Sequence, residues 1–348
     1  MTSTAVQVAP DERLAKSGLW DRLVVRPEIG ALLGALLVFV FFSVFTNDFL
    51  SPLGVSNWLD DASTLGIMAV VVALLMIGGE FDLSAGVMTA STSLVTAILT
   101  TQAGMNVWPA LLISLAFALG VGAVNGWLVI RTGLPSFIVT LGTFLALQGL
   151  NLGVTRVVTG TVQVSGMRSA SGYESTGQLF ASTIDVGGTA FPVSILWWIA
   201  LAAVAAWILV RTRFGNWIFA VGGSSLSSRA VGVPVLRTKV LLFMGTAFGA
   251  WVVGSINLLR NASVQANQGI GLEFQYIIAA VIGGCLLTGG FGSAVGAAIG
   301  ALIFGMARQG IVYAQWNNDW FMLFLGVMLL AAVLVNNTFR RRAERVRR

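Results

Sequence analysis

The sequence predicts an all-α integral membrane protein of about ten transmembrane helices, interrupted at several points by glycine. Three observations predict this class. Of the 348 residues, 56% are hydrophobic and only 10% are charged, whereas an average soluble protein carries about 25% charged residues. The apolar residues form long charge-free runs, and about 20 such residues cross a membrane as a helix. The 41 glycines are typical of membrane helices that pack closely.

Eight charge-free runs account for the ten helices. The run 87–130 has 44 residues, roughly 66 Å as a helix, and divides at 104–109; the run 274–307 divides at 288–293. The helix expected in 274–287 would span only about 21 Å, so nine full crossings and a re-entrant hairpin remain an alternative. The eight runs are 29–47, 62–79, 87–130, 132–155, 186–210, 240–259, 274–307 and 320–339.

The basic residues indicate how the chain is oriented. Ten crossings place both termini on one side, and sixteen of the 20 Lys and Arg residues then lie on that side. Basic residues accumulate on the cytoplasmic side of membrane proteins. We therefore predict a cytoplasmic N-terminal tail (1–28), a membrane domain (29–339) and a basic cytoplasmic tail (340–348). Because the basic residues flank apolar spans, the net charge of +6 does not indicate a nucleic-acid partner.

Composition also excludes several chemistries. The chain has no histidine, and Cys285 is its only cysteine, so no histidine metal site and no intrachain disulfide is expected. The sequence lacks the Gly-x-x-x-x-Gly-Lys-[Ser/Thr] phosphate loop, and its only lysines are Lys16 and Lys239. We expect no catalytic residue, no metal and no cofactor on this chain.

Two glycine-rich stretches interrupt the apolar pattern. The first, 78–86, places Glu80 and Asp82 between two apolar helices. It is either a broken, buried element beside a solute pathway or an ordinary cytoplasmic turn in which Asp82 or Ser84 caps the next helix. The second carries the tripeptide Ile-Gly-Gly at 282–284, which also occurs at 77–79. Paired glycine-interrupted segments indicate internal repeats around a central site, although so short a match also arises by chance.

Two long loops and a few polar residues complete the candidates. The cytoplasmic loop 212–238 is long for a bundle connection, and 225–231 is expected to form a short helix that ends before Gly232. The loop suits either protein docking or anionic lipid. The opposite loop, 155–189, is either a docking surface or a plain polar loop. Four polar residues on apolar helices are candidates either to line a pathway or to hydrogen-bond between helices: Asn125, Thr143, Gln148 and Asn151.

Four motifs in order resemble one family, the permease subunits of bacterial ATP-binding-cassette importers for monosaccharides (the ribose, xylose, fructose and galactose type). Residues 79–86, Gly-Glu-Phe-Asp-Leu-Ser-Ala-Gly, resemble the family's Gly-x-x-Asp-Leu-Ser-x-Gly. Asn-Gly at 125–126 followed by Pro-Ser-Phe-Ile-Val-Thr-Leu-Gly-Thr at 135–143 is similar to a second motif. Residues 220–232 resemble the cytoplasmic coupling loop, and 282–296 the Gly-Gly-x-x-x-x-Gly-Gly-x-Gly-Ser segment. The resemblance covers roughly 66–336.

The resemblance implies a multi-pass protein of the bacterial inner membrane that carries a monosaccharide into the cytoplasm. Its implied partners are a second permease copy in a homodimer, a cytoplasmic ATPase that binds ATP and Mg²⁺, a periplasmic sugar-binding protein and membrane lipid. The family's Glu-Ala-Ala before the loop arginine is replaced here by Leu-Ser-Ser at 226–228, which puts the detailed ATPase contacts in question. The implied coupling residues are Gly222, Gly223, Arg229 and Gly232, and the conformational motif residues are Gly79, Glu80, Asp82, Ser84, Gly86, Gly283 and Gly284.

Other functions are less well supported by the residues. A secondary symporter usually carries acids, histidines or cation sites within the membrane, and here only Glu80 and Asp82 qualify, both toward the cytoplasmic end. A membrane enzyme would need a cluster of acids, nucleophiles or metal ligands at one depth, which the sequence does not show. Within the importer hypothesis, a polyol or a nucleoside is the alternative solute.

Overall fold

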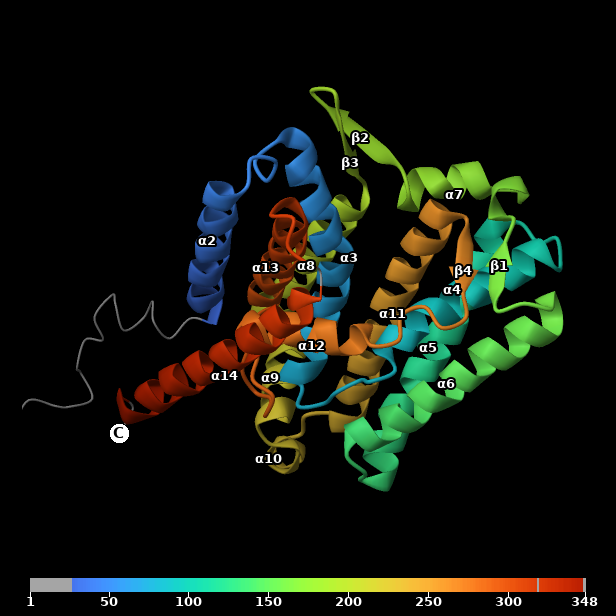
Figure 1. The fold of residues 1–348 in the computed structure, drawn as a ribbon. Helices are drawn as coiled ribbons and strands as arrows, with labels where there is room; N and C mark the ends of the chain where they lie inside the picture. The colour runs from blue at the N-terminus through green and yellow to red at the C-terminus, as the bar shows by residue number, and fades with distance from the viewer. Residues whose placement is uncertain (1–26, 318, 347–348) are drawn as a thin grey trace, which may run out of the picture.

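The protein is almost entirely helical (Figure 1). The structure is a computed structural model that describes residues 27–317 and 319–346, with side chains for residues 28–317 and 319–334. Seven described helices are long and apolar enough to cross a membrane: α2 (Pro27–Phe45), α3 (Pro52–Ile77), α5 (Val107–Thr132), α6 (Ser136–Thr159), α8 (Ser194–Arg211), α11 (Val235–Asn261) and α13 (Ala294–Tyr313).

Three shorter apolar helices complete the set: α4 (Ala85–Thr101), α12 (Leu272–Ile282) and the first part of α14 (Trp320–Val346). The predicted all-α membrane fold with about ten helices is therefore confirmed. The side of the membrane on which the termini lie stays a prediction. Most of the predicted tail 1–28 lies outside the described residues, and α14 continues beyond the predicted span end at 339 into the basic segment.

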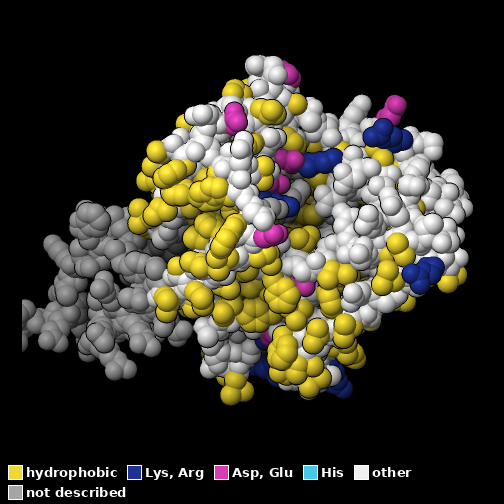
Figure 2. Space-filling view, viewed as in Figure 1, with side chains coloured by type: hydrophobic (Ala, Val, Ile, Leu, Met, Phe, Trp, Pro, Cys, Tyr) yellow, Lys and Arg dark blue, Asp and Glu magenta, His cyan; other side chains and the backbone are white. Residues whose placement is uncertain are grey.

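Helices α3 and α11 form the centre of the bundle. Helix α3 packs against α8, α11, α12 and α13, while α11 packs against α4 and α5. Helix α6, at the right of Figure 1, packs on one side only. We call the end that carries α9 (Arg213–Gly223) and α10 (Ser225–Ala230) the lower end. The end that carries α7 (Tyr173–Phe180) and the hairpin of β2 (Thr183–Val186) and β3 (Thr189–Pro192) is the upper end. Figure 2 shows a largely apolar face with charged side chains of both signs in a hollow.

The start of α3 differs from the prediction. Helix α3 begins at Pro52, ten residues before the predicted start at 62. The prediction excluded Asp60 and Asp61 from the apolar span, but tertiary partners compensate their charges. Arg260 Nη1 lies 2.9 Å from Asp60 Oδ2, and Arg308 Nε lies 4.0 Å from Asp61 Oδ2.

The start of α8 was also predicted wrongly. The predicted span 186–210 began inside a hairpin of β2 (Thr183–Val186) and β3 (Thr189–Pro192), and α8 starts only at Ser194. Gly187 and Gly188 form the two-residue turn with φ angles of +63° and +83°. Two successive positive φ values are what a tight hairpin needs. The apolar residues at the start of the predicted run 186–210 therefore belong to this hairpin and to the short connection between β3 and α8.

The segment before α13 is a broken crossing. Helix α12 has 11 residues, about 16 Å of rise, so by itself it does not span a core of roughly 30 Å. The chain reaches it from β4 (Ser263–Gln265) through a non-helical stretch and leaves it through another at 283–293. The expected short helix in 274–287 is thus confirmed, and it crosses only part of the bundle.

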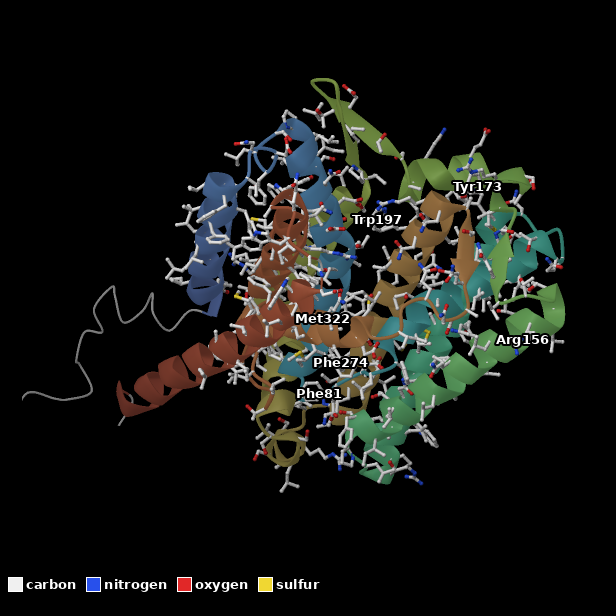
Figure 3. All side chains as sticks on the ribbon, in the orientation of Figure 1. Phe81, Arg156, Tyr173, Trp197, Phe274 and Met322 are labelled. Carbon is white, nitrogen blue, oxygen red and sulfur yellow. The ribbon has the colours of Figure 1, made fainter. Side chains whose placement is uncertain are left out.

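Both long loops are structured. The upper loop forms β1 (Gln163–Ser165), η2 (Met167–Ser169) and α7 (Tyr173–Phe180), and β1 pairs antiparallel with β4. The Tyr173 hydroxyl donates to Leu259 O at 2.7 Å, which attaches α7 to α11 (Figure 3). The lower loop forms α9 (Arg213–Gly223) and α10 (Ser225–Ala230). The predicted short helix there is confirmed, and Gly232 follows it with a φ of +83°.

Candidate functional site

Helices α3 and α12 end in the same way. After Ile77, Gly79 N donates to Met76 O at 2.9 Å and Glu80 N donates to Leu75 O at 3.2 Å. The second tripeptide repeats the pattern: Gly284 N donates to Val281 O at 2.9 Å and Cys285 N to Ala280 O at 3.0 Å. Gly79 and Gly284 have φ angles of +80° and +92°. Both ends are Schellman motifs, which require a left-handed residue and favour glycine there.

The backbone of α9 lies against both broken segments at the lower end. Gly290 N donates to Ile77 O at 2.8 Å. A Cβ atom on Gly222 would overlap Ile77 O and would lie 2.7 Å from Gly290 N, and one on Gly289 would lie 2.7 Å from Gly79 Cα. We call Gly79, Gly222, Gly289 and Gly290 the glycine junction. It brings the predicted coupling loop into direct backbone contact with the end of α3 and with the non-helical segment 283–293 that follows α12.

The connection from α3 to α4 is buried beside α6. Glu80 is 7% exposed and Asp82 is 4% exposed. Phe81 N donates to Ser136 Oγ at 3.0 Å, and Leu83 N donates to Thr140 Oγ1 at 3.0 Å; Figure 3 shows Phe81 in the lower half of the bundle. Non-helical backbone inside a membrane protein is tolerated where protein groups satisfy it. Of the two interpretations of 78–86, the geometry favours the broken, buried element over the ordinary turn.

A polar cluster holds this connection against three helices. Asp82 Oδ1 accepts hydrogen bonds from Ser84 N at 2.9 Å and from Ser84 Oγ at 2.6 Å, and Thr246 Oγ1 of α11 lies 3.0 Å from Asp82 Oδ2. Asn125 Nδ2 of α5 donates to Ser84 Oγ at 3.2 Å, and Thr143 Oγ1 of α6 donates to Asn125 Oδ1 at 2.6 Å. Ser84 precedes α4 without capping it through its side chain.

Replacement of Asp82 by alanine tests this cluster. The change removes the acceptor of Ser84 N and Ser84 Oγ, and an unsatisfied buried donor costs about 1–3 kcal/mol. We expect Asp82→Ala to lower the melting temperature of the purified protein and to lose assembly or transport. Asp185→Ala is the control, because Asp185 is an exposed acceptor in the β2–β3 turn. Full expression, stability and activity of Asp82→Ala would show that Asp82 is a replaceable turn residue.

A buried ion pair fixes the start of the same connection. Lys239 Nζ of α11 donates to Glu80 Oε1, and Lys239 is 8% exposed. Two charges taken out of water require each other, since either alone would be an uncompensated buried charge. The pair ties the residue after the first Schellman motif to the first turns of α11.

The other predicted residues fall into separate places. Gly86 packs against the start of α12, where a Cβ atom would lie 2.9 Å from Glu273 N; Gly283 packs against α13, where it would lie 2.5 Å from Ala297 Cα. Gly223, Arg229 and Gly232 are exposed at the lower end. Asn125 and Thr143 lie in the polar cluster, in hydrogen bonds between helices. Higher on α6, Gln148 is half-buried, and Asn151 is buried with an Nδ2 group that donates to no described residue.

Several residues of the site were not singled out from the sequence. Gly289 and Gly290 lay in the predicted break at 288–293 and in the fourth family motif without being selected, and Lys239 was counted only among the cytoplasmic basic residues. Lys239 lies 159 positions from Glu80 in the chain, so no local pattern links the two residues. Its rarity was the one feature that could have singled it out, because the chain has only two lysines. Ser136 and Thr140 lie in the second family motif but were not selected from it, and Thr246 has no distinguishing signal in an apolar helix. No group of three or more potential metal ligands occurs among the described residues.

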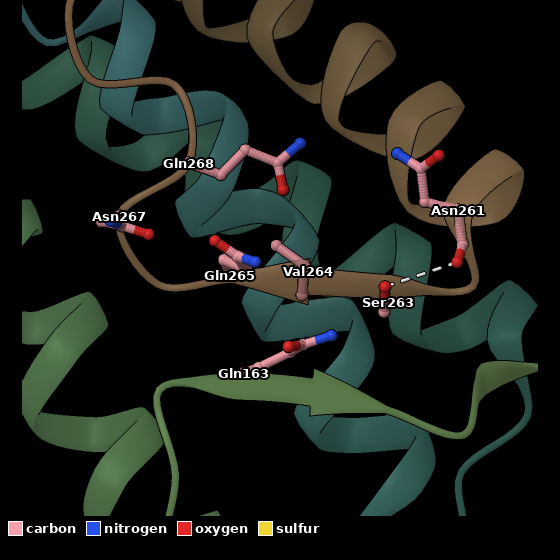
Figure 4. Close-up of a pocket in the computed structure, with 7 residues that line it drawn as sticks. All are labelled: Gln163, Asn261, Ser263, Val264, Gln265, Asn267 and Gln268. Atoms are coloured by element: carbon pink, nitrogen blue, oxygen red, sulfur yellow. Dashed lines mark hydrogen bonds between the residues drawn. The ribbon is translucent and has the colours of Figure 1, made fainter.

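The upper end carries an uncharged hollow. A cavity of about 400 Å³ lies beside the β1–β4 ribbon and is lined mainly by carboxamides (Figure 4). The side chains come from β1, from the last turn of α11, and from β4 with the loop after it. The lining residues are Gln163, Asn261, Ser263, Val264, Gln265, Asn267 and Gln268.

A family model describes most of this chain. The model for the permease component of the branched-chain amino acid transport system matches residues 54–333. The chain belongs to this permease family. The permease is 32% identical to the probable ABC transporter permease protein YphD of Escherichia coli K12, with 92% of each chain covered. It is 30% identical to the ribose import permease protein RbsC of the same strain, with 88% of this chain and 92% of the relative covered.

Another relative is named for a second sugar, xylose. The xylose transport system permease protein XylH of E. coli K12 is 28% identical to the permease, over 91% of this chain and 93% of the relative. No solved structure gave a significant match. The permease is accordingly a multi-pass protein of the bacterial inner membrane and a transport subunit without enzymatic activity. Family membership implies that it works with an ATPase subunit and a periplasmic binding protein.

Proposed function

We propose that the permease forms the membrane pathway of an ATP-driven importer for a monosaccharide. The observation that carries this proposal is the glycine junction, because α9 touches the end of α3 and the non-helical segment 283–293 that follows α12. A displacement of α9 by a partner at the lower end would reach the end of α3 and this segment through backbone contacts alone. Two relatives that cover most of the chain are named for ribose and xylose, which supports a monosaccharide as the solute.

The lower end is then the cytoplasmic end. Among the basic residues whose side chains the structure describes, six lie near the lower end (Arg131, Arg211, Arg213, Arg229, Arg237 and Lys239) and four toward the upper end (Arg156, Arg168, Arg260 and Arg308). Arg260 and Arg308 have acidic partners, so the unpaired positive charge is mainly at the lower end. This distribution supports cytoplasmic termini.

The partners occupy the two ends in this proposal. The ATPase, which binds ATP and Mg²⁺, docks on the lower loop 212–238. There α10 exposes Leu226, and Val231 follows it with 79% of its surface exposed. The periplasmic binding protein docks at the upper end on α7, the β2–β3 hairpin and the carboxamide hollow. A second permease copy forms a homodimer; Gly142, Gly149 and Gly153 of α6 face no atoms within 4 Å, and small residues allow close helix packing.

Purification with partner identification tests the proposal. The tagged permease is extracted from native membranes in mild detergent, and its partners are identified by mass spectrometry. We expect a stoichiometric nucleotide-binding ATPase, and ATP-dependent sugar uptake once the complex and its binding protein are reconstituted. A chain that purifies alone and moves solute in liposomes without ATP would instead be a facilitator or a symporter. ATP-dependent uptake of only a polyol or a nucleoside would change the solute class.

Charge reversal at Arg229 tests the docking site. Arg229 is exposed on α10, and we propose that it pairs with a carboxylate of the ATPase. Like charges placed together across an interface cost several kcal/mol, and about 1.4 kcal/mol is a factor of ten. We expect Arg229→Glu to reduce uptake by about tenfold or more with normal membrane insertion. Arg168→Glu, an exposed reversal at the upper end, is the control for charge alone. Normal uptake by Arg229→Glu would remove this residue from the docking site.

A further inference from the structure

A second cavity opens between α3, α11, α12 and α13. Its volume is about 240 Å³, several times the roughly 30 Å³ share of one water molecule and just below the range for drug-sized ligands, about 300–1,000 Å³. Residues of α3, α11, α12 and α13 line it: Asp61, Thr64, Leu65, Val253, Asn257, Leu272, Gln275, Tyr276, Phe304, Gly305 and Arg308. We propose that this cavity binds the transported solute, an uncharged polyhydroxylated molecule, within a single copy of the permease. This inference rests on the proposed importer function.

Four polar side chains of the cavity have no hydrogen-bond partner among the residues that the structure describes. Thr64, Asn257, Gln275 and Tyr276 make no side-chain hydrogen bond to any described residue. Tyr276 is nevertheless only 2% exposed. Polar groups in a protein interior normally have a partner, either protein or ordered water or ligand. These four groups come from three helices and are brought together only in the folded bundle.

The chemistry of these groups matches hydroxyl groups. A hydroxyl and a carboxamide can each donate and accept hydrogen bonds, as a sugar hydroxyl does. Leu65, Leu272 and Phe304 supply apolar contact area for the C–H faces of a sugar ring. Ligand sites typically combine apolar walls with a few polar groups that fix orientation.

The two charged residues of the cavity compensate each other. Asp61 Oδ2 accepts from Gln309 Nε2 at 2.7 Å and lies 4.0 Å from Arg308 Nε. The lining contains one acidic and one basic side chain, so its net charge is zero. It therefore does not attract an ion of either sign. Removing an ion from water without an opposite charge is costly, and the cavity therefore favours a neutral solute over an inorganic ion.

The cavity is built on the helices that carry the two Schellman motifs. Asp61 and Thr64 belong to α3, and Gln275 and Tyr276 belong to α12; both helices end at the lower end in Ile-Gly-Gly. Phe274, at the start of α12, lies a little above Phe81 in Figure 3. A solute in the cavity would thus touch α3, whose end α9 contacts in the glycine junction, and α12, whose following segment 283–293 α9 also contacts. Relative movement of α3 and α12 would change the cavity and the junction together.

Cysteine accessibility tests the inference directly. Cys285 is the only cysteine in the chain, so Cys285→Ser provides a background for single-cysteine variants. Asn257→Cys and Gln275→Cys place a thiol in the cavity, and Gln163→Cys places one in the carboxamide hollow as a control. The permease–ATPase complex in nanodiscs is treated with a membrane-impermeant methanethiosulfonate, with or without D-ribose, D-xylose or leucine. Sugar uptake by the background variant is first measured in proteoliposomes with the binding protein.

We expect a transported sugar to slow modification of Asn257→Cys and Gln275→Cys about tenfold at roughly ten times its Kd, since mass action then leaves about one-tenth of the sites empty. Leucine and the Gln163→Cys control should show no protection. A sugar that is transported but protects neither cavity cysteine would overturn the subsite and leave the importer function standing. Equal protection at Gln163→Cys would also overturn it. Absence of ATP-dependent uptake of any sugar would overturn the proposed function, and the subsite with it. Two cavity positions are used so that one misfolded variant does not decide the result.

Discussion

Replacement of Gly222 by alanine is expected to stop solute uptake. A Cβ atom at this position would overlap the carbonyl oxygen of Ile77 and would lie 2.7 Å from Gly290 N. Both are backbone atoms in the glycine junction, so they cannot move aside as the end of a flexible side chain would. Overpacking in a well-packed interior typically costs about 1–3 kcal/mol. We expect uptake to fall by about tenfold or more at equal membrane levels, which corresponds to about 1.4 kcal/mol or more.

The adjacent glycine provides a matched control. Gly223 has no atom within 4 Å of a built Cβ, and its φ is not positive. Gly223→Ala should therefore keep uptake close to that of the unchanged permease. Stimulation of the partner ATPase by the loaded binding protein separates coupling from folding: Gly222→Ala should keep basal ATP hydrolysis and lose the stimulation. Wild-type uptake by Gly222→Ala would show that α9 does not need close backbone contact with the broken helices.

Removal of Lys239 is expected to have the largest effect on stability. Lys239→Met leaves the Glu80 carboxylate, which is 7% exposed, without its partner. Breaking one side of a buried ion pair costs about 3–5 kcal/mol, because an uncompensated charge stays in the interior. We expect a large fall in melting temperature in detergent and a loss of monodisperse protein on size-exclusion chromatography.

Two further variants separate the ion pair from general damage. Replacement of both partners by uncharged groups is often tolerated, so Glu80→Gln combined with Lys239→Met should recover most of the lost stability. Arg237→Met removes an exposed positive charge two residues away on α11 and should be near neutral. If Lys239→Met alone is as stable as Arg237→Met, the pair does not hold the connection against α11.

The main features of the fold could be predicted from the sequence. Charge-free length and glycine position are properties of local sequence, and they were sufficient for the ten apolar helices, for the breaks at 77–79 and 282–284 and for the short helix in the lower loop. Composition alone also showed that the chain has no phosphate loop. The local sequence predicted a helix boundary wrongly where a distant residue compensates a charge. Asp60 and Asp61 read as a loop, but Arg260 and Arg308 allow them to lie on α3.

The candidate site could be predicted only in part. Glu80, Asp82 and Ser84 were found because acids are costly in apolar surroundings and therefore stand out. Their partners could not be found, because a threonine or an asparagine on an apolar helix looks the same whether it faces a pathway or a neighbouring helix. Asn125 and Thr143 illustrate this, since both were candidates for the pathway and both hydrogen-bond between helices.

The sequence by itself determined which segments are helices and where they break. Only the tertiary structure decided that Gly222 meets Gly79 and Gly290, that Lys239 neutralises Glu80, and that four polar groups with no hydrogen-bond partner among the described residues share one cavity. The physical reason is that helix length and hydrophobicity depend on neighbouring residues. Close backbone contact and charge compensation depend instead on pairs of residues that are far apart in the chain. No local sequence pattern shows that two such residues lie close together in space.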